Sequence, residues 1–497
     1  MIDHLELPTY PMALRLFAAQ FTYIGTIFAF VPKTTFESRL KKAYGGPPDL
    51  NDREACLAYA QVLVLLAFGQ MYSVNQWNGP KSPGPPGFEY FTHALQFLPD
   101  IHEDGSVLFI EVLSLVGYFM QNLNRRDAAF LYVGVALRMA ISLALHQEVY
   151  DPQMHEAERE HRRRIWWSVY SLDRIRCAKS GNPITINDED IGVKLPSPLR
   201  RLEPKICAAT TLLHYTELSR ILGRIMKTIY RKTRKTGNTL IASVQQIMTS
   251  LAVWHRDVPE ELRFHPQKLA TSRESVSTFL HYYQCINMTA RPLLFYVVQQ
   301  RLAAGLADKE QDWRKGLSQP TISVIEACVS AAANTISMMT VAAQKDLVAT
   351  YGYMDGEHAF SAAAVLVMVG VAFPLNQVDV ASIDTSLELL RGMADRGNTH
   401  MGAKLDLLLR LRSLVPHVDA QDDILPAQPQ NFDPEVMGFH TTFDVTDFAA
   451  MDATELAEFF TFDSDIIDFS LWEEGYTNAD VSMEQEITQW EDTMQHR

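Results

Sequence analysis

Cysteine is scarce in this sequence, and its cysteines stand far apart. The 497 residues include five, Cys56, Cys177, Cys207, Cys285 and Cys328, and no two of them are fewer than 30 positions apart. Zinc and dithiol redox sites need cysteines, or cysteines with histidines, at short spacings, so neither kind of site can be built from these residues. The odd count and wide spacing indicate buried free thiols in a reducing compartment.

Long hydrophobic runs and a secretory signal are also lacking. The longest apolar stretches, residues 16–31 and 359–374, contain polar side chains and are shorter than the ~20 apolar residues of a membrane-spanning helix. The first six residues lack the basic region that precedes the apolar core of a signal peptide. We therefore expect two buried core helices, no membrane partner and no secretion.

Motifs for phosphate, dinucleotide and ester chemistry are missing. No glycine cluster fits the Walker loop, the dinucleotide fingerprint or the Gly-x-Ser-x-Gly elbow. His155 and His161 stand six positions apart, which separates them by ~120° around a helix, so they cannot share a metal ion as an i, i+4 pair can. The acidic triplet Asp188-Glu189-Asp190 could hold a metal in an all-α prenyl-diphosphate enzyme. No second acidic motif accompanies it, and an exposed capping turn is the favoured interpretation.

Charge is unevenly distributed along the chain. Residues 417–497 contain 20 acidic residues and one basic residue, a net charge of −19, whereas residues 1–416 carry 43 Lys and Arg against 39 Asp and Glu. A nearly neutral body with an acidic tail is typical of a folded domain followed by an interaction segment. One basic run could contact phosphates or act as a nuclear import signal, although a solvated helix end is the favoured interpretation: Arg220, Arg224, Lys227, Arg231, Lys232, Arg234 and Lys235.

Helical periodicity dominates, and the alternating pattern of strands is nearly absent. Apolar residues recur every three to four positions in ten segments, 57–68, 107–120, 128–146, 165–177, 212–230, 240–254, 275–300, 321–343, 359–373 and 382–396. Polar residues of 131–146 form one narrow stripe, Arg138, Ser142 and His146, which predicts a helix enclosed nearly all round. We predict an all-α fold, a large irregular helical bundle or superhelix over residues 1–416, with a disordered acidic tail over residues 417–497.

Residues 131–196 resemble the middle homology region of fungal binuclear zinc-cluster transcription factors. The motifs that carry the resemblance follow one another in order: Leu143-Ala-Leu-His146, Glu160-His-Arg-Arg-Arg-Ile-Trp-Trp167, Asp173-Arg174, Ser180-Gly-Asn-Pro183, Ile186-Asn-Asp-Glu-Asp190 and Leu195-Pro196. A second motif, Thr35-Phe36-Glu-Ser-Arg39-Leu40, is similar to the end of the family's first helix, and the resemblance extends over residues 7–414. Asn182 stands where the family usually has arginine, and Ala144 where glycine is common.

The resemblance implies that the matching residues have a structural role: aromatic rings and ion pairs fix two turns of helix in the core. These residues are Leu145, His146, Glu160, Arg163, Arg164, Trp166, Trp167, Asp173, Arg174, Gly181, Pro183, Asp188, Asp190, Leu195 and Pro196. No catalytic or metal-binding residue is predicted among them. The expected domains are a regulatory middle domain at residues 1–416 and an activation segment at residues 417–497.

The family normally begins with six cysteines that hold two zinc ions and place a helix in the DNA major groove. This sequence lacks them, so we expect no cofactor in this chain, and DNA contact through a missing zinc cluster or a partner protein. Three explanations stay open: a gene model truncated at its start, a regulator that never had a cluster, or a protein that has lost regulation. A homodimer also stays open.

The acidic tail has the composition of an activation domain. Its apolar residues stand among acids whose mutual repulsion keeps the chain expanded, and so they remain available to coactivator surfaces. The predicted contact residues are Phe459, Phe460, Phe462, Phe469, Leu471 and Trp472. A terminal helix folded onto the body through Phe459, Phe460 and Leu471 is the alternative.

The resemblance thus implies a nuclear fungal regulator, an activator of RNA polymerase II genes, and not an enzyme. Secondary metabolism and nutrient use are both common targets of the family, and no residue here selects between them. The alternative is an all-α enzyme or small-molecule-binding protein that uses the interior of the helical body. The missing metal motif, the missing nucleophile arrangement and the acidic aromatic tail argue against it.

Overall fold

The computed structural model describes residues 5–28, 30–73, 85–100, 104–199, 202–230, 237–264, 271–303, 314, 317, 319–372 and 377–413. Within these ranges the chain forms fourteen α-helices and no β-strand, which confirms the all-α prediction. The acidic segment 417–497 and its six predicted contact residues lie outside the described residues.

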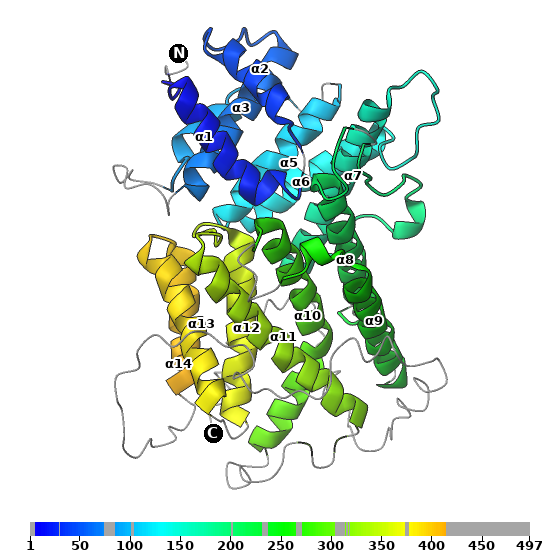
Figure 1. Cartoon of the computed structure of the whole chain (residues 1–497), viewed down its shortest axis with the longest axis vertical. Helices are drawn as coiled ribbons and strands as arrows, with labels where there is room; N and C mark the ends of the chain where they lie inside the picture. The colour runs from blue at the N-terminus through cyan, green and yellow to red at the C-terminus, as the bar shows by residue number, and fades with distance from the viewer. Residues whose placement is uncertain are drawn as a thin grey trace.

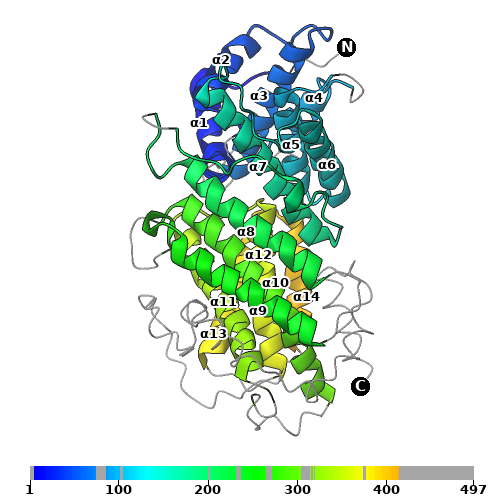
Figure 2. The same ribbon diagram turned by 90° about the vertical axis from the view of Figure 1, so that its right-hand side faces the viewer.

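The helices are arranged in two halves that follow one another along the chain. Helices α1 to α7 form one half and α8 to α14 the other, and the two halves are stacked along the long axis (Figures 1 and 2). The N-terminal half contains α1 (Tyr10–Gln20), the π-helical turn η1 (Phe21–Gly25), α2 (Lys33–Ala43), α3 (Arg53–Tyr72), α4 (Phe88–Leu95), α5 (Val107–Asn122), α6 (Arg126–Ser142) and α7 (Glu156–Ser180). The C-terminal half contains α8 (Ala208–Thr228), α9 (Gly237–Asp257), α10 (Arg273–Ala303), α11 (Gln319–Gln344), α12 (Tyr353–Ala372), α13 (Gln377–Asp395) and α14 (Thr399–Ser413).

Helices α3 and α5 form the centre of the N-terminal half. The side chain of Asp52 accepts a hydrogen bond from the amide of Ala55, and Ser106 accepts one from the amide of Phe109, so each helix begins with an N-cap. Most residues of both helices are apolar and buried on every face, as expected for helices enclosed by others. Helix α3 packs against α1, α2, α4 and α5, and the core is continuous across them.

Two described helices are long and apolar enough to cross a bilayer by length and composition. They are α3 (Arg53–Tyr72) and the Thr321–Gln344 part of α11, and 83% and 72% of their apolar windows are buried inside the protein. Burial of this extent is that of core helices. The apolar stretch at residues 16–31, predicted as one core helix, is instead divided: α1 ends at Gln20, and the π-helical turn η1 ends at Gly25.

Helix α6 is less buried than the sequence predicted. Its buried residues, Ala129, Val133, Ala136, Leu137 and Ala140, form one face that packs against α5 and α7. The opposite face is open, because the Leu131 side chain is 65% exposed. The helix also ends at Ser142, four residues before the predicted end. The prediction that α6 is enclosed nearly all round was therefore wrong. A narrow polar stripe does not exclude exposed apolar residues on the same helix.

A few specific contacts connect the two halves beside the packing of α7 on α8. The Tyr23 hydroxyl in η1 donates a hydrogen bond to the Asp346 carbonyl after α11, and the Arg273 guanidinium of α10 lies over the Tyr23 ring at 4.9 Å from its centroid. The Tyr353 amide at the start of α12 donates to the side chain of Asn122 at the end of α5. The segment between α11 and α12 is therefore joined by hydrogen bonds to η1 and to the end of α5.

Candidate functional site

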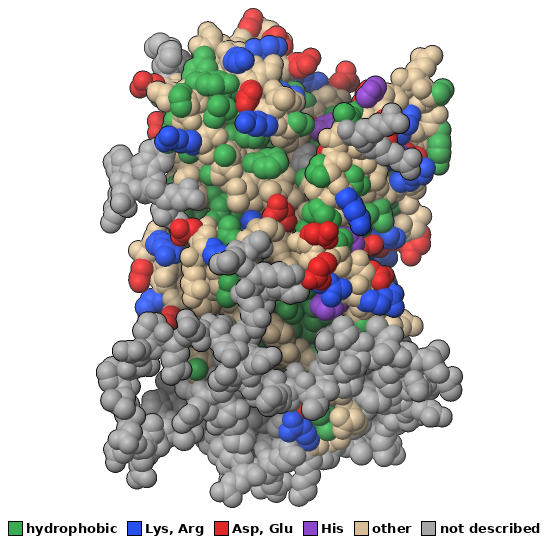
Figure 3. Space-filling view, viewed as in Figure 1, with side chains coloured by type: hydrophobic (Ala, Val, Ile, Leu, Met, Phe, Trp, Pro, Cys, Tyr) green, Lys and Arg blue, Asp and Glu red, His purple; other side chains and the backbone are tan. Residues whose placement is uncertain are grey.

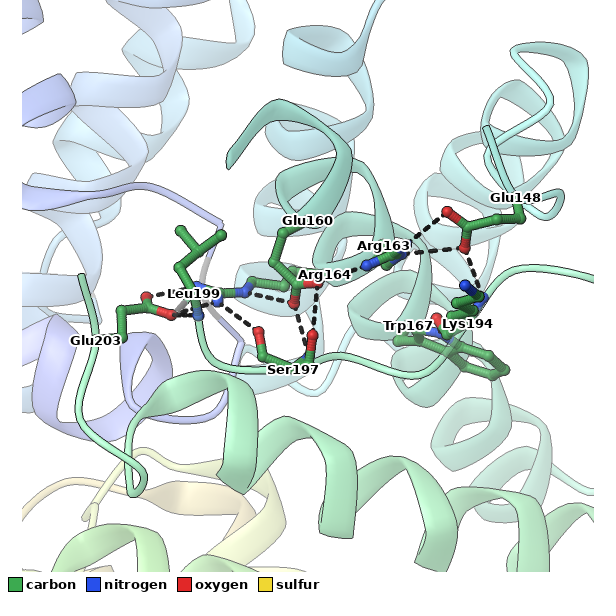
Figure 4. Close-up of polar contacts among 9 residues, drawn as sticks. All are labelled: Glu148, Glu160, Arg163, Arg164, Trp167, Lys194, Ser197, Leu199 and Glu203. Atoms are coloured by element: carbon green, nitrogen blue, oxygen red, sulfur yellow. Dashed lines mark hydrogen bonds and ion pairs between the residues drawn. The ribbon is translucent and has the colours of Figure 1, made fainter. Parts of the chain in front are cut away.

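The residues that carry the family motifs gather on α7 and on the segment that follows it, residues 181–199, which we call the strap. Helix α7 begins beside His155, whose ring accepts a hydrogen bond from the amide of Ala157, and it ends at Ser180, with Gly181 as its C-cap. Gly181 has a φ of 68°, a left-handed conformation in which glycine carries no penalty, and this turn reverses the chain. The strap then runs back along α7 (Figure 4).

Glu160 and Arg164, one turn apart on α7, bind the end of the strap. The Arg164 Nε donates to Glu160 Oε1 at 3.0 Å, and its two terminal nitrogens donate to both oxygens of Glu203 at 2.8 and 2.6 Å. Glu160 in turn accepts a hydrogen bond from the Ser197 amide at 2.8 Å (Figure 4). The Arg164 hydrogen bonds hold the pKa of Glu203 below its usual value, so this carboxylate stays charged.

Arg163 and Trp167 hold the middle of the strap. Arg163 makes a bidentate ion pair with Glu148 at 3.0 and 2.6 Å, and Glu148 also accepts a hydrogen bond from the Lys194 amide. Burial would raise the pKa of Glu148, but these hydrogen bonds lower it overall. The indole of Trp167 donates to the Lys194 carbonyl at 2.7 Å. Both backbone polar groups of Lys194 are therefore fixed to the N-terminal half.

Leu145 and His146 follow α6 in the turn before α7 and contact the strap through the backbone. The His146 carbonyl accepts hydrogen bonds from the amides of Gly192 and Val193 at 2.9 and 3.0 Å. The His146 ring lies 5.7 Å from the ring of Trp166, which is fully buried, and Leu145 is buried as well. Ala144 has a positive φ of 54°, so the position where the family commonly has glycine does require that backbone conformation.

Asp173 and Arg174 hold the beginning of the strap. Asp173 accepts a hydrogen bond from the Thr185 hydroxyl at 2.9 Å, and burial raises the pKa of Asp173. Arg174 donates to the Ile186 carbonyl and to Asp188 at 3.0 Å, and it lies over the Tyr170 ring at 4.4 Å from the centroid. Burial raises the pKa of Tyr170, whose hydroxyl donates to Asp188 at 2.7 Å.

The remaining motif residues have smaller roles. Pro183 and Asp190 are exposed, Leu195 is half-buried and Pro196 is buried. The Asp190 carbonyl accepts a hydrogen bond from the Gln147 side chain, so this residue contributes its backbone. The motif as a whole therefore fastens one extended segment to one helix.

The acidic triplet and the basic run, treated separately in the sequence, lie opposite one another. Asp188 is 3.7 Å from Arg220, and Glu189 is 3.9 Å from Lys227. The short 3-10 turn that contains the triplet, η2 (Asp188–Asp190), thus forms ion pairs with α8, and the Asp188 side chain accepts hydrogen bonds from Tyr170 and Arg174 of α7. The predicted capping role is not seen, because α8 begins after Cys207 without a side-chain cap. No group of three His, Cys, Asp or Glu residues in the described part of the chain is placed to hold a metal ion. Arg231, Lys232, Arg234 and Lys235 lie outside the described residues.

The motif at residues 35–40 lies on α2 and meets a buried carboxylate. Phe36 stacks on Phe17 of α1 with centroids 4.2 Å apart. Arg39 hydrogen-bonds Gln61 of α3 and lies 3.9 Å from Glu111 of α5, and Glu111 also contacts His161 of α7 at 2.8 Å. Four helices therefore meet around Glu111.

Sequence reasoning missed the partners of the motif. Glu148, Glu203, Thr185 and Glu111 complete its ion pairs and hydrogen bonds, and none of them was singled out. Glu111 did carry a signal, because it is the only charged residue in the apolar segment 107–120. Glu148 and Glu203 carried none, because their roles depend on how the chain turns back.

Four of the five thiols are buried, and Cys207 is half-buried. Burial raises the pKa of Cys177 and Cys328 to about 12, and it raises that of Cys285 further. A thiol with so high a pKa is almost entirely protonated at neutral pH and is a poor nucleophile. The prediction of buried free thiols is therefore confirmed for Cys56, Cys177, Cys285 and Cys328, whereas Cys207 is only half-buried.

On the face drawn in Figure 3, hydrophobic side chains and charges of both signs are interspersed over the N-terminal half. This face carries no broad basic area among the residues that the figure colours. The α7 and strap network is therefore the most specific arrangement of polar groups that the sequence motifs bring together.

A family model and several curated relatives match the part of the sequence that contains α7 and the strap. The family described as fungal specific transcription factor domain matches residues 21–256, which run from η1 to α9 and include α7 and the strap. An uncharacterized transcriptional regulatory protein of Schizosaccharomyces pombe is 23% identical over 325 residues, which cover 64% of this chain and 40% of that protein.

Two further relatives are regulators by name. The thiamine repressible genes regulatory protein of Schizosaccharomyces pombe is 22% identical over 66% of this chain and 41% of its own length. The activator of stress genes 1 of Saccharomyces cerevisiae is 23% identical over 55% of this chain and 30% of its own length. The chain thus spans less than half the length of each of these relatives. Residues 21–256 thus match the fungal specific transcription factor domain, and the relatives that this chain resembles are named as regulatory proteins or activators.

Proposed function

We propose that this chain is the regulatory body and activation segment of a fungal transcriptional activator of RNA polymerase II genes. One observation carries the proposal. The residues that match the family include α7 and the strap, where the motif residues form one network of hydrogen bonds and ion pairs. The relatives named above are transcriptional regulators, and none of them is named as an enzyme. We assign no catalytic step to the body.

The two parts of the chain differ in charge, and we propose a different role for each. The acidic segment 417–497 contacts coactivators, and residues 1–416 control its availability. Contact with DNA is made by a zinc cluster outside this chain or by a partner protein, and the protein acts in the nucleus. The acids supply solubility and long-range attraction, whereas the aromatic residues supply the contact area.

The proposal is tested by fusing residues 417–497 to an unrelated DNA-binding domain and measuring reporter transcription. We expect activation, and we expect it to fall to background when the predicted contact residues are changed to alanine: Phe459, Phe460, Phe462, Phe469, Leu471 and Trp472. The control is a variant with Phe443→Ala and Phe448→Ala, which keeps the charge and most aromatics and should retain activation. A wild-type segment that fails to activate would contradict the proposal.

The proposed control by residues 1–416 is tested with the full chain. Fused to the same DNA-binding domain, the full chain should activate to a different level than residues 417–497 alone. Equal activation by the two would show that the body exerts no control. A fluorescent tag on the full chain tests the nuclear location in the same cells, and exclusion from the nucleus would count against the assignment.

A further inference from the structure

The end of the strap carries an exposed serine that precedes a proline. Ser197 is exposed, and Pro198 follows it in a part of the strap without regular secondary structure. A protein kinase takes its substrate segment into an open cleft in extended form, and proline-directed kinases require a proline directly after the modified residue. In the described part of the chain, Ser197 is the only serine or threonine that stands before a proline.

The residues that follow Pro198 in the sequence are basic. Arg200 stands third after Ser197, and Arg201 comes next, although both lie outside the described residues. Some proline-directed kinases select a basic residue at this third position. The other Ser-Pro pair of the sequence, Ser82-Pro83, also lies outside the described residues and has a proline at that position. The two pairs therefore differ as kinase substrates.

The contacts of Ser197 join the end of the strap to α7. Its amide donates a hydrogen bond to Glu160 Oε1 at 2.8 Å, and its hydroxyl donates one to Glu160 Oε2 at 3.3 Å. Its carbonyl accepts one from Arg164 at 3.1 Å, and the Leu199 amide donates to Glu203 at 2.9 Å (Figure 4). The Ser197 hydroxyl therefore lies within hydrogen-bond distance of a carboxylate.

The charges around Ser197 disfavour a further anion. Two arginines of α7 already pair with three carboxylates, and these five groups are Arg163, Arg164, Glu148, Glu160 and Glu203. The Glu160 side chain is only 2% exposed, so water and salt screen its charge little. A phosphoserine carries a charge of about −1.5 to −2 at pH 7. A phosphate on Ser197 therefore repels Glu160, and it also removes the hydroxyl hydrogen that Glu160 accepts.

We propose that a proline-directed protein kinase phosphorylates Ser197, and that the phosphate releases the end of the strap, residues 195–199, from α7. The γ-phosphoryl group of ATP passes to the Ser197 Oγ, so an O–P bond forms there. The bond between the γ-phosphorus and the β-phosphate oxygen breaks, ADP leaves, and the hydroxyl proton passes to the catalytic aspartate of the kinase.

The contacts with α7 also set the order of events. The kinase takes the segment while its end is detached from α7, and repulsion by Glu160 then prevents its return. The middle of the strap stays bound, because Lys194 is held by Trp167 and Glu148. The inference concerns modification of the helical body and does not depend on the proposed transcriptional role.

Incubation of the full chain with a cyclin-dependent protein kinase and ATP tests the modification. We expect mass spectrometry to find phosphate on Ser197, and Ser197→Ala to lose it. The matched control is Ser82→Ala, which removes the other Ser-Pro pair and should leave the phosphate on Ser197 unchanged. A folded chain that takes up no phosphate at Ser197 overturns the inference.

Hydrogen–deuterium exchange of the phosphorylated chain tests the release. The Ser197 and Leu199 amides should exchange faster by about tenfold or more, because both lose their carboxylate acceptors. The amides of Gly192 and Val193, which donate to the His146 carbonyl, should exchange as before. Equal exchange of Ser197 and Leu199 in the phosphorylated and unmodified chains overturns the proposed release.

Three variants separate charge from shape at this position. Ser197→Asp should speed the exchange of the Leu199 amide, whereas Ser197→Asn, which has nearly the same shape without the charge, should change it much less. Glu160→Gln combined with Ser197→Asp should reduce the effect of the aspartate, measured against Glu160→Gln alone, because the repelling charge is gone. Equal effects of aspartate and asparagine contradict the electrostatic cause.

Discussion

At the scale of single residues, Trp167 joins the core to the strap. Its ring is buried between α7 and its neighbours, and its one polar atom reaches the Lys194 carbonyl. The sequence predicted that the Trp-Trp pair anchors a helix, because large aromatics in a helical repeat are usually buried. It could not predict the acceptor, because Lys194 lies 27 positions away in a segment without regular structure.

We expect Trp167→Ala to lower the free energy of unfolding by ~3–5 kcal/mol, because it leaves a large cavity. Trp167→Phe should cost about 1–2 kcal/mol, because most of the ring volume stays while the hydrogen bond to Lys194 is lost. Urea denaturation of the full chain measures both. Tyr150→Ala is the control, since that ring is 81% exposed, and it should change nothing measurable. An unchanged stability of Trp167→Ala would refute the structural assignment.

At the scale of elements, the sequence predicted helices better than it predicted their exposure. Ten periodic segments all correspond to helices, because burial on one face imposes the three-to-four spacing. Helices α1, α2, α4 and α14 lie outside these ten segments, and α6 was expected to be enclosed although Leu131 on its outer face is exposed. Which apolar face finds a neighbour depends on the packing of other helices, and no local pattern contains that information.

The crossing of α1 and α3 depends on a glycine. A Cβ on Gly69 would lie 2.5 Å from the Leu16 carbonyl oxygen, so the two helices could not approach as they do. We expect Gly69→Ala to cost about 1–2 kcal/mol of unfolding free energy, since overpacking outweighs the better helix propensity of alanine. Thermal denaturation measures the change.

Gly392 of α13 provides the matched comparison for Gly69. Nothing lies within 4 Å of a Cβ at Gly392, so Gly392→Ala should gain about 0.5–1 kcal/mol through helix propensity alone. Two glycines in helix interiors should thus respond to the same substitution with opposite signs. A stabilising Gly69→Ala would mean that α1 and α3 do not cross so closely.

At the scale of the whole molecule, two histidines buried in the C-terminal half, His281 and His358, make stability depend on pH. Burial lowers the pKa of His281 from 6.5 to about 3, and it lowers that of His358 well below 6.5. The folded state therefore binds fewer protons than the unfolded state below pH ~6.5. Stability must fall as the pH falls through this range, by up to ~1.4 kcal/mol per pH unit for each histidine.

We expect the urea midpoint of the wild type to drop between about pH 7 and about pH 5.5, and to drop less in His281→Phe. Phenylalanine keeps the stacking of this ring on Tyr215, whose centroid lies 4.6 Å away, and removes the titration. An identical pH dependence in the two proteins would show that His281 does not titrate on unfolding.

The contact between Tyr23 and Asp346 also bears on the order in which the chain folds. Most helices pack against their neighbours in sequence, and local contacts of this kind form early and fast. The Tyr23 hydrogen bond instead joins positions 323 residues apart. During synthesis the N-terminal half is complete long before residue 346 leaves the ribosome. The Tyr23 hydroxyl therefore cannot donate to the Asp346 carbonyl until most of the body has been made.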